Sequence, residues 1–178
     1  MNPECPNTVA PGRSIGELID QLAETHHPRL RREVLRVEAI VREMTVHGEV
    51  GDPPHVDIQQ LAQGLSACVD AQLNSEEQIL FPMLRRLEHQ TQVSRCRAGM
   101  IASRVRIAER EFARIRGVLL RLCELAKEYA SPHGPCESCH ELSRMVETLL
   151  FELRQHADKE LGVLYPWAVA RELELAAT

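Results

Sequence analysis

The sequence predicts an all-α protein that folds as an up-and-down four-helix bundle. Apolar residues recur at helical spacing in four long segments, aromatic residues make up only 3% of the chain, and glycines and prolines cluster at a few breaks. With 178 residues, 44% of them hydrophobic, the chain is long enough to bury one core. We therefore expect a flexible leader at 1–13, the helical bundle at 14–173 and a C-terminal tail at 174–178.

The first predicted helix begins after Ser14, a residue type that caps helix N-termini, and reaches about His47. Its apolar residues alternate between spacings of four and three, as a single buried face requires: Leu30, Val34, Val37, Val41 and Met44. Glycine and proline in residues 48–54 end this helix. The second predicted helix covers about 55–89, and its inward stripe includes the polar residues Gln72 and Glu76.

The third predicted helix follows a polar connection near residues 94–99 and ends at residues 131–135. Its stripe is entirely apolar: Ile101, Val105, Ala108, Phe112, Ile115, Leu119 and Leu122. The fourth covers about 137–172 and carries His156 and Glu160 inside an apolar seam with heptad spacing. Four helices of similar length with short links pack naturally as an antiparallel bundle.

Charge and composition exclude several classes of protein. The net charge is −5 and arginine is scattered among glutamate, so we expect no nucleic-acid binding, which needs positive charge on one face. No apolar run is long enough for a membrane span, and no basic start precedes an apolar stretch. We therefore expect a cytoplasmic protein whose six cysteines are free thiols or ligands rather than disulfides.

One pattern occurs twice, 84 residues apart: Gln72-x-x-x-Glu76-x-x-Ile79-Leu80-Phe81-Pro82 and His156-x-x-x-Glu160-x-x-Val163-Leu164-Tyr165-Pro166. A spacing of four residues places both polar side chains of each copy on one helix face, one turn apart. Burying Glu76 and Glu160 unpaired would cost several kcal/mol. The repeat therefore predicts a cation, a buried arginine or a proton beside these carboxylates. Glu77 points away from the stripe, and we expect it to be exposed.

The first helix offers two adjacent histidines. His27 lies on the stripe that continues through Leu30 and Val34, whereas His26 lies slightly off it, so we choose His27 as the inward residue. Pro28 leaves the choice open, because a proline can reset the helical phase at this point. We expect the histidines near helix ends and in loops to be solvated: His47, His55, His89 and His133.

These residues resemble the hemerythrin-like, HHE cation-binding family over about 14–170. The resemblance is closest to its branch of di-iron proteins linked to repair of iron-sulphur clusters damaged by nitric oxide or oxidants. It is carried by four strings: Thr25-His26-His27-Pro28, Val46-His47-Gly48, Glu76-Glu77-Gln78-Ile79-Leu80-Phe81-Pro82 and His156-x-x-x-Glu160. The implied fold is a hemerythrin-like four-helix bundle.

The resemblance implies a non-haem metal site with His27, Glu76, His156 and Glu160 as ligands. The implied cofactor is iron, as one or two ions, or another divalent metal. The implied small ligands are O₂, NO or peroxide, and iron-sulphur proteins are the implied partners. Dimerisation and the reaction type stay open, as does the question whether the protein is an enzyme.

Two positions depart from the family pattern, in which every helix supplies an inward histidine. The second-helix histidine falls on Gln72 and the third-helix histidine on Arg104. An amide oxygen is a weak ligand, and a guanidinium has no lone pair to offer. One hypothesis is that Arg104 pairs with Glu76 or Glu160 in place of a second metal. The alternative is that Arg104 extends into solvent.

Two other classes of function fit the same sequence. The first is a degenerate, metal-free bundle that acts as a protein-interaction or regulatory module. The second is a thiol redox protein that uses Cys136 and Cys139, because a helix N-terminus stabilises a thiolate. Metal content separates the first from the metal-binding interpretation, and replacement of both cysteines tests the second.

Overall fold

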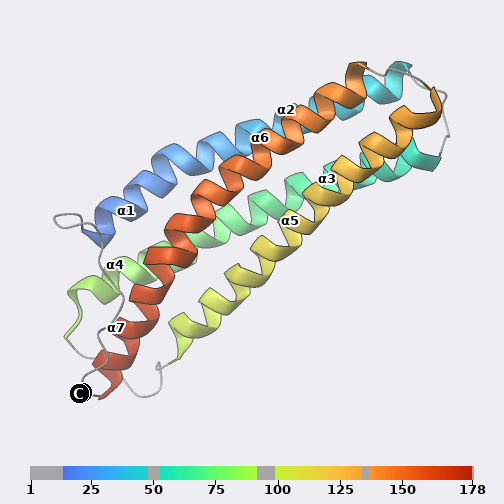
Figure 1. The fold of residues 1–178 in the computed structure, drawn as a ribbon. Coiled ribbons are helices and arrows are strands. Elements are labelled where there is room, and N and C mark those ends of the chain that lie inside the picture. Colours follow the sequence, from blue (N-terminus) through green and yellow to red (C-terminus); the bar gives the residue numbers. More distant parts are fainter. Residues whose placement is uncertain (1–13, 48–52, 92–98, 134–136, 178) are drawn as a thin grey trace.

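The computed structural model describes residues 14–47, 53–91, 99–133 and 137–177, which form four antiparallel helical rods (Figure 1). We use rod for each continuous helical run. The first rod contains α1 (Ile15–Gln21), η1 (Leu22–His26) and α2 (His27–His47), and the second contains α3 (Pro53–Ser75), η2 (Glu76–Leu80) and α4 (Phe81–His89). The third rod is α5 (Met100–His133), and the fourth contains α6 (Glu137–Lys159), η4 (Glu160–Leu164) and α7 (Tyr165–Ala177).

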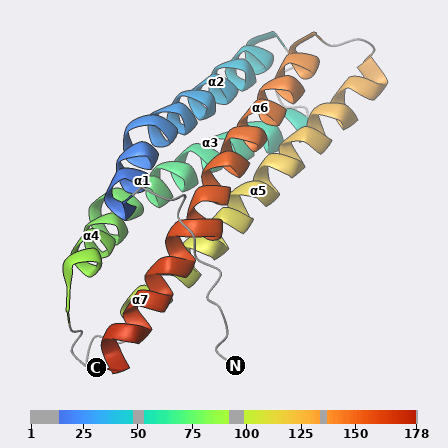
Figure 2. The same ribbon diagram turned by 60° about the vertical axis from the view of Figure 1, so that its left-hand side comes forward.

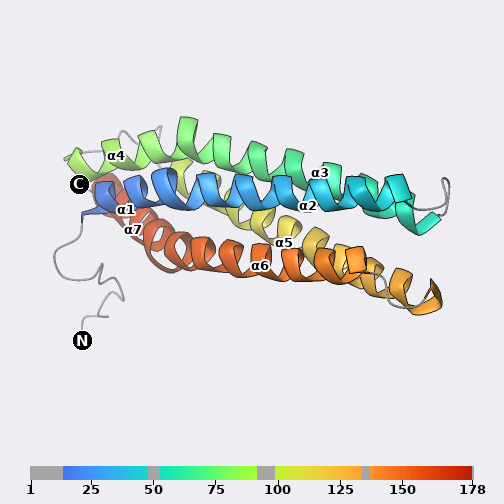
Figure 3. The same ribbon diagram turned by 90° about the horizontal axis from the view of Figure 1, so that it is seen from above.

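Along the long helices each rod packs against two neighbours, and α4 also contacts α7 at one end of the bundle. The helix α2 packs against α3 and α6, and α5 packs against the same two helices. Turning the molecule shows the rods side by side along their whole length, with α1, α4 and α7 together at one end (Figures 2 and 3). The inward stripes predicted from the sequence are largely buried, with Leu65, Leu119 and Leu142 fully enclosed. Beyond Glu76 and Glu160 the buried face is displaced by one residue, so that Leu80 is buried and Ile79 is 38% exposed. The all-α four-helix fold predicted from the sequence is therefore confirmed.

The rods begin and end close to the positions predicted from residue type. Ser14 caps α1, since its hydroxyl accepts a hydrogen bond from the Glu17 backbone N–H, and the Ser14 backbone N–H donates one to the Glu17 side chain. The third rod extends to His133, slightly beyond the predicted start of its break at residue 131. The fourth continues to Ala177, so residues 174–177 are helical where we expected a tail. The expected leader at 1–13 lies outside the described residues.

A short π-helical segment interrupts the α-helix in three of the rods. The residue after each segment donates its N–H to a carbonyl five residues earlier: His27 to Leu22, Phe81 to Glu76, and Tyr165 to Glu160. In each case the next residue is a proline: Pro28, Pro82 and Pro166. A proline ring lacks an N–H and crowds the carbonyl of the preceding turn, so the wider π turn accommodates it.

The π turn before Pro28 changes the helical phase, a possibility that the sequence analysis had left open. Both adjacent histidines are buried as a result, with 8% of His26 and none of His27 exposed. The other two π segments begin at Glu76 and Glu160. All three irregular turns therefore adjoin polar residues that the sequence analysis placed inside the bundle. Among the described helices, none combines the length and apolar character that crossing a membrane requires.

A buried carboxylate caps the start of α5 from another rod. Glu172 on α7 is 3% exposed, and it accepts hydrogen bonds from the backbone N–H groups of Ile101 at 3.0 Å and Ala102 at 3.2 Å. The N-terminal N–H groups of a helix have no partner within the helix, and the helix dipole favours a negative charge there. Glu172 therefore fixes the position of α5 against the fourth rod.

We expect Glu172→Ala to lower the free energy of unfolding by about 1 to 3 kcal/mol, because the buried N–H of Ile101 and the half-buried N–H of Ala102 lose their acceptor. Urea unfolding followed by circular dichroism measures this change. Glu124→Ala is the control: it removes an exposed ion pair with Arg121 and should change the free energy of unfolding far less. Equal effects of the two substitutions would contradict the role assigned to Glu172.

Candidate metal centre

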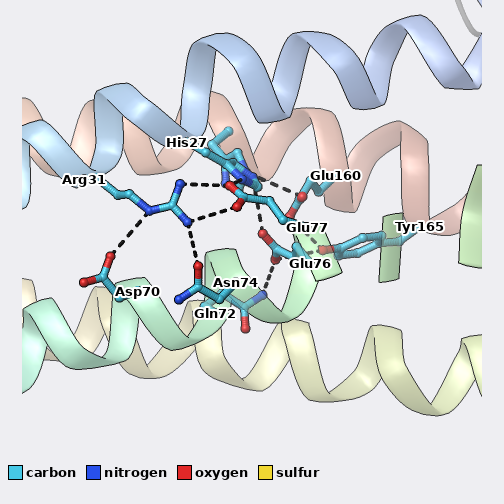
Figure 4. A network of polar contacts seen from close by, with 10 residues as sticks. His27, Arg31, Asp70, Gln72, Asn74, Glu76, Glu77, Glu160 and Tyr165 are labelled. Carbon is cyan, nitrogen blue, oxygen red and sulfur yellow. Dashed lines mark hydrogen bonds and ion pairs between the residues drawn. The ribbon is translucent and has the colours of Figure 1, made fainter. Parts of the chain in front are cut away.

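Four side chains from three rods meet in the core at the level of the π turns. They are His27, Glu76, His156 and Glu160, and each offers a ligand atom within 4.8 Å of the others. None is more than 1% exposed. Figure 4 shows His27 and Glu160 reaching from their rods toward Glu76. The structure thus brings together the four residues that the sequence analysis named as metal ligands, and among the described residues this is the His/Cys/Asp/Glu cluster that could hold a metal ion.

The two imidazoles face each other through their Nε2 atoms, which lie 3.1 Å apart. Two nitrogen lone pairs repel at this distance, so a proton or a cation must lie between them. Each ring is held by an aromatic neighbour: His27 stacks on Phe81, and His156 lies beside Phe112, with ring centroids 5.4 Å apart in both pairs. The aromatic contacts restrict the imidazole orientations before any cation binds.

The carboxylate oxygens divide into two sets. Glu76 Oε1 accepts hydrogen bonds from the Gln72 amide and, at 3.1 Å, from the Tyr165 hydroxyl, which also lies 2.8 Å from Glu160 Oε2 (Figure 4). The other oxygens, Glu76 Oε2 and Glu160 Oε1, are buried without a hydrogen-bond partner. These unpaired oxygens lie 3.4 Å from His27 Nε2 and 3.5 Å from His156 Nε2, respectively. Buried oxygens that lack donors are suited to bind a cation.

Burial shifts the ionisation of all four residues toward their neutral forms. Desolvation raises the pKa of Glu76 to about 8, and desolvation together with the charge of Glu76 raises the pKa of Glu160 well above its ordinary value. Desolvation lowers the pKa of His156 well below its ordinary value, with His27 adding to the effect. Desolvation also lowers the pKa of His27. Neutral imidazoles are the form that binds metals, whereas each carboxyl must lose its proton to do so.

A chain of charged groups orients His27 from outside. Its Nδ1 lies 2.7 Å from Glu77 Oε1, and the same oxygen accepts a hydrogen bond from Arg31 at 2.8 Å. Asn74 and Asp70 hold the Arg31 guanidinium in turn (Figure 4). Burial works to raise the pKa of Glu77, but Arg31 and His27 outweigh it and hold that pKa below its ordinary value. Glu77 is therefore ionised, His27 donates Nδ1–H to it, and the Nε2 lone pair faces the cluster.

The opposite side of Glu76 lacks imidazoles. A cavity of about 20 Å³ lies there between the second and third rods, lined by Gln72, Ser75, Glu76, Leu80, Arg104, Ile107 and Ala108. Ala108 is the buried α5 residue among them. Arg104 is exposed and forms no ion pair with Glu76 or Glu160. The hypothesis that Arg104 pairs with these carboxylates is therefore wrong, because its side chain turns to solvent, as the alternative expected.

A larger groove of about 620 Å³ lies between α5 and α6. Phe112, Leu150, Leu153 and Leu161 contribute apolar lining, and Glu109, Arg116, Arg154 and Asp158 contribute charged side chains. Since the Phe112 ring also contacts His156, this ring lies between the groove and the cluster. A small molecule in the groove is thus one aromatic side chain from His156.

Other candidates lie outside the cluster. His26 is buried, with its ring centroid 6.2 Å from that of His156, but it is not among the four converging residues. His89 is exposed, as expected. The side chains of His47, His55 and His133 lie outside what the structure describes. Cys136 also lies outside the described residues, and Cys139 is only 1% exposed, which disfavours it as a reactive thiol.

Sequence reasoning missed two residues of the site. Glu77 was expected to be exposed, yet it is half-buried and bonded to His27, so that expectation is wrong. Its phase on a regular helix points outward, but the π turn that begins at Glu76 changes the direction. Tyr165 stood in the repeated motif without a role, and it bridges the two carboxylates. Pro82 was the available signal for the change at Glu77, because a proline inside a helix favours a π turn in the preceding residues.

Comparison with known proteins agrees with this geometry. The model of the Hemerythrin HHE cation binding domain matches residues 18–168. Proteins named iron-sulfur cluster repair protein YtfE from Yersinia pseudotuberculosis serotype IB (strain PB1/+) and Yersinia pestis (strain Pestoides F) are each 26% identical over 161 residues. The alignment covers 89% of this chain and 66% of each relative, so the chain spans slightly less than two thirds of their length.

We expect the metal-free protein to lose stability as the pH rises from 6.5 to 8. The folded state holds protons on Glu76 and Glu160 that the unfolded state, with an ordinary pKa of 4.5, has already released. The histidines oppose this only below about pH 6.5, where the unfolded imidazoles gain protons. Urea unfolding in chelator should show a loss of about 1 kcal/mol or more over this interval. The double variant Glu76→Gln/Glu160→Gln should show little change, and an equally steep dependence in it would refute the assignment.

We expect Glu77→Gln to weaken metal binding about 10-fold or more, because His27 loses the charged acceptor that fixes its Nδ1–H. Competition with a chromophoric chelator measures the dissociation constant. Glu111→Gln removes a carboxylate from an exposed ion pair with Arg114 and should leave the constant unchanged. Unchanged affinity in Glu77→Gln would show that Glu77 does not orient a ligand.

Proposed function

Because this chain belongs to the hemerythrin HHE cation-binding family, we propose that it is a non-haem metal-binding protein whose core cluster binds iron. The ligands in this proposal are His27, Glu76, His156 and Glu160. Nitrogen and carboxylate oxygen donors in combination suit iron and similar divalent metals. Another divalent metal is the alternative cofactor.

One observation carries the proposal: two buried carboxylate oxygens without donors converge on two facing imidazole nitrogens. A bundle that needed no cation would satisfy such oxygens with protein donors, as Gln72 and Tyr165 do for the other two. The aromatic contacts and the Glu77 chain hold the imidazoles in place. Several side chains of the protein therefore serve to orient the four donor residues.

The proposed ligands of the centre are O₂, NO or peroxide, and the proposed role is defence against oxidative or nitrosative stress, including repair of iron-sulphur clusters in partner proteins. Bound iron would supply redox chemistry and a coordination position for a small molecule. The relatives named iron-sulfur cluster repair proteins support the repair role. The groove beside Phe112 supports access of a small molecule to the His156 side. A cytoplasmic location, predicted from the sequence, belongs to the same proposal.

Iron content tests the proposal directly. Protein expressed with added iron and purified without oxygen or chelator should retain iron, and His156→Ala should lose most of it, because one of two imidazole donors is removed. Elemental analysis per chain gives the readout. His140→Ala, which alters an exposed histidine at the start of α6, is the matched control and should retain iron.

Circular dichroism of each variant separates loss of metal from loss of fold. Wild-type protein that stays metal-free even after reconstitution would refute the proposal. It would favour the metal-free interaction module predicted as the alternative from the sequence.

A further inference from the structure

We propose that the centre binds a single metal ion, and that Gln72 and Tyr165 supply hydrogen bonds where a second ion would otherwise neutralise the carboxylates. This inference rests on the proposed metal binding and specifies its stoichiometry. It narrows the one or two ions implied by the family resemblance to one. The residues of this chain fit one ion and do not fit the second.

The division of the carboxylate oxygens is the first argument. Glu76 Oε2 and Glu160 Oε1 are unpaired and face the imidazoles, so they form one donor set with His27 Nε2 and His156 Nε2. Glu76 Oε1 already receives hydrogen bonds from Gln72 and Tyr165, and Glu160 Oε2 contacts the Tyr165 hydroxyl. A second ion on these oxygens would displace those contacts and leave buried polar groups to find other partners.

The lack of further donors is the second argument. On the side of Glu76 away from the imidazoles, the third rod presents the methyl group of Ala108, and Arg104 is exposed. Gln72 offers only a neutral amide, and its nitrogen points to Glu76. The second ion would therefore have shared carboxylates but no imidazole, although imidazole and carboxylate together make an iron site.

Gln72 acts in this scheme as a positioning residue. Its amide holds Glu76 Oε1, and this directs Oε2 toward His27. Tyr165 holds both carboxyl groups from the fourth rod, which keeps Glu160 Oε1 near His156. Both donors are neutral, so the ionised carboxylates retain negative charge for the one cation that the imidazoles can reach.

A single ion would offer its open coordination position to one small molecule, O₂, NO or peroxide, with no second metal to share it.

The test counts ions and examines their coupling. Metal-free protein is loaded with Mn²⁺, excess ion is removed by desalting, and the count per chain is taken as the difference between wild type and His156→Ala. The difference should be one, and the electron paramagnetic resonance spectrum should be that of an isolated ion. A difference of two with a spin-coupled spectrum would overturn this inference while leaving the proposed function intact. No difference, with no iron retained either, would refute the proposed function itself.

The role of Gln72 needs a separate variant. Gln72→Leu should keep the count at one and leave the Mn²⁺ spectrum unchanged, with weaker affinity, because Gln72 positions Glu76 and does not bind the ion. Gln60→Leu, at an exposed position on the same helix, should match the wild type in all three measurements. A changed ligand field in folded Gln72→Leu would show that the amide is a ligand and overturn the assignment.

Discussion

The burial of Glu76 and Glu160 in an apolar core is the constraint on which the rest of the site depends. Two carboxylates removed from water need protons, donors or a cation, and without them they cost several kcal/mol. Two of the four carboxylate oxygens are hydrogen-bonded, by a tyrosine hydroxyl and a glutamine amide. The other two oxygens have no hydrogen-bond partner and lie near the two imidazoles, so the electrostatics of the core define both where a cation belongs and which atoms bind it.

The irregular turns of the helices position these groups in the core. A regular α-helix passes a proline only with strain, and three rods here relieve that strain with a π turn at the same level of the bundle. The widened turns put His27, Glu76 and Glu160 at or beside the irregularity, and beyond η2 and η4 the buried apolar face is shifted by one residue, to Leu80 and Leu164. The prolines that accompany the π turns therefore also influence the geometry of the site, and the long helices hold that geometry rigidly.

The site is asymmetric, because the two sides of Glu76 carry different side chains. One side of Glu76 has two imidazoles, an ionised Glu77 and an Arg31 that fixes it. The other side has an amide, a methyl group and a cavity large enough for about one water molecule. The fold is shared across the family, but function depends on the atoms that reach the core. The side chains on each side of Glu76, rather than the shared architecture, determine which cation the bundle can hold and where.

The sequence by itself determined the four rods, their limits to within a few residues, and the two in-phase pairs Gln72/Glu76 and His156/Glu160. These follow from helical periodicity and from glycine and proline breaks, which act over short stretches of chain. The sequence also favoured His27 as the inward histidine, although Pro28 left His26 open. Only the tertiary structure decided that Glu77 supports His27, that Tyr165 bridges the carboxylates and that Arg104 faces solvent. A side chain's direction near a π turn depends on a phase shift that regular periodicity does not contain, and its partners belong to rods far apart in sequence. Those contacts exist only after the four rods have packed.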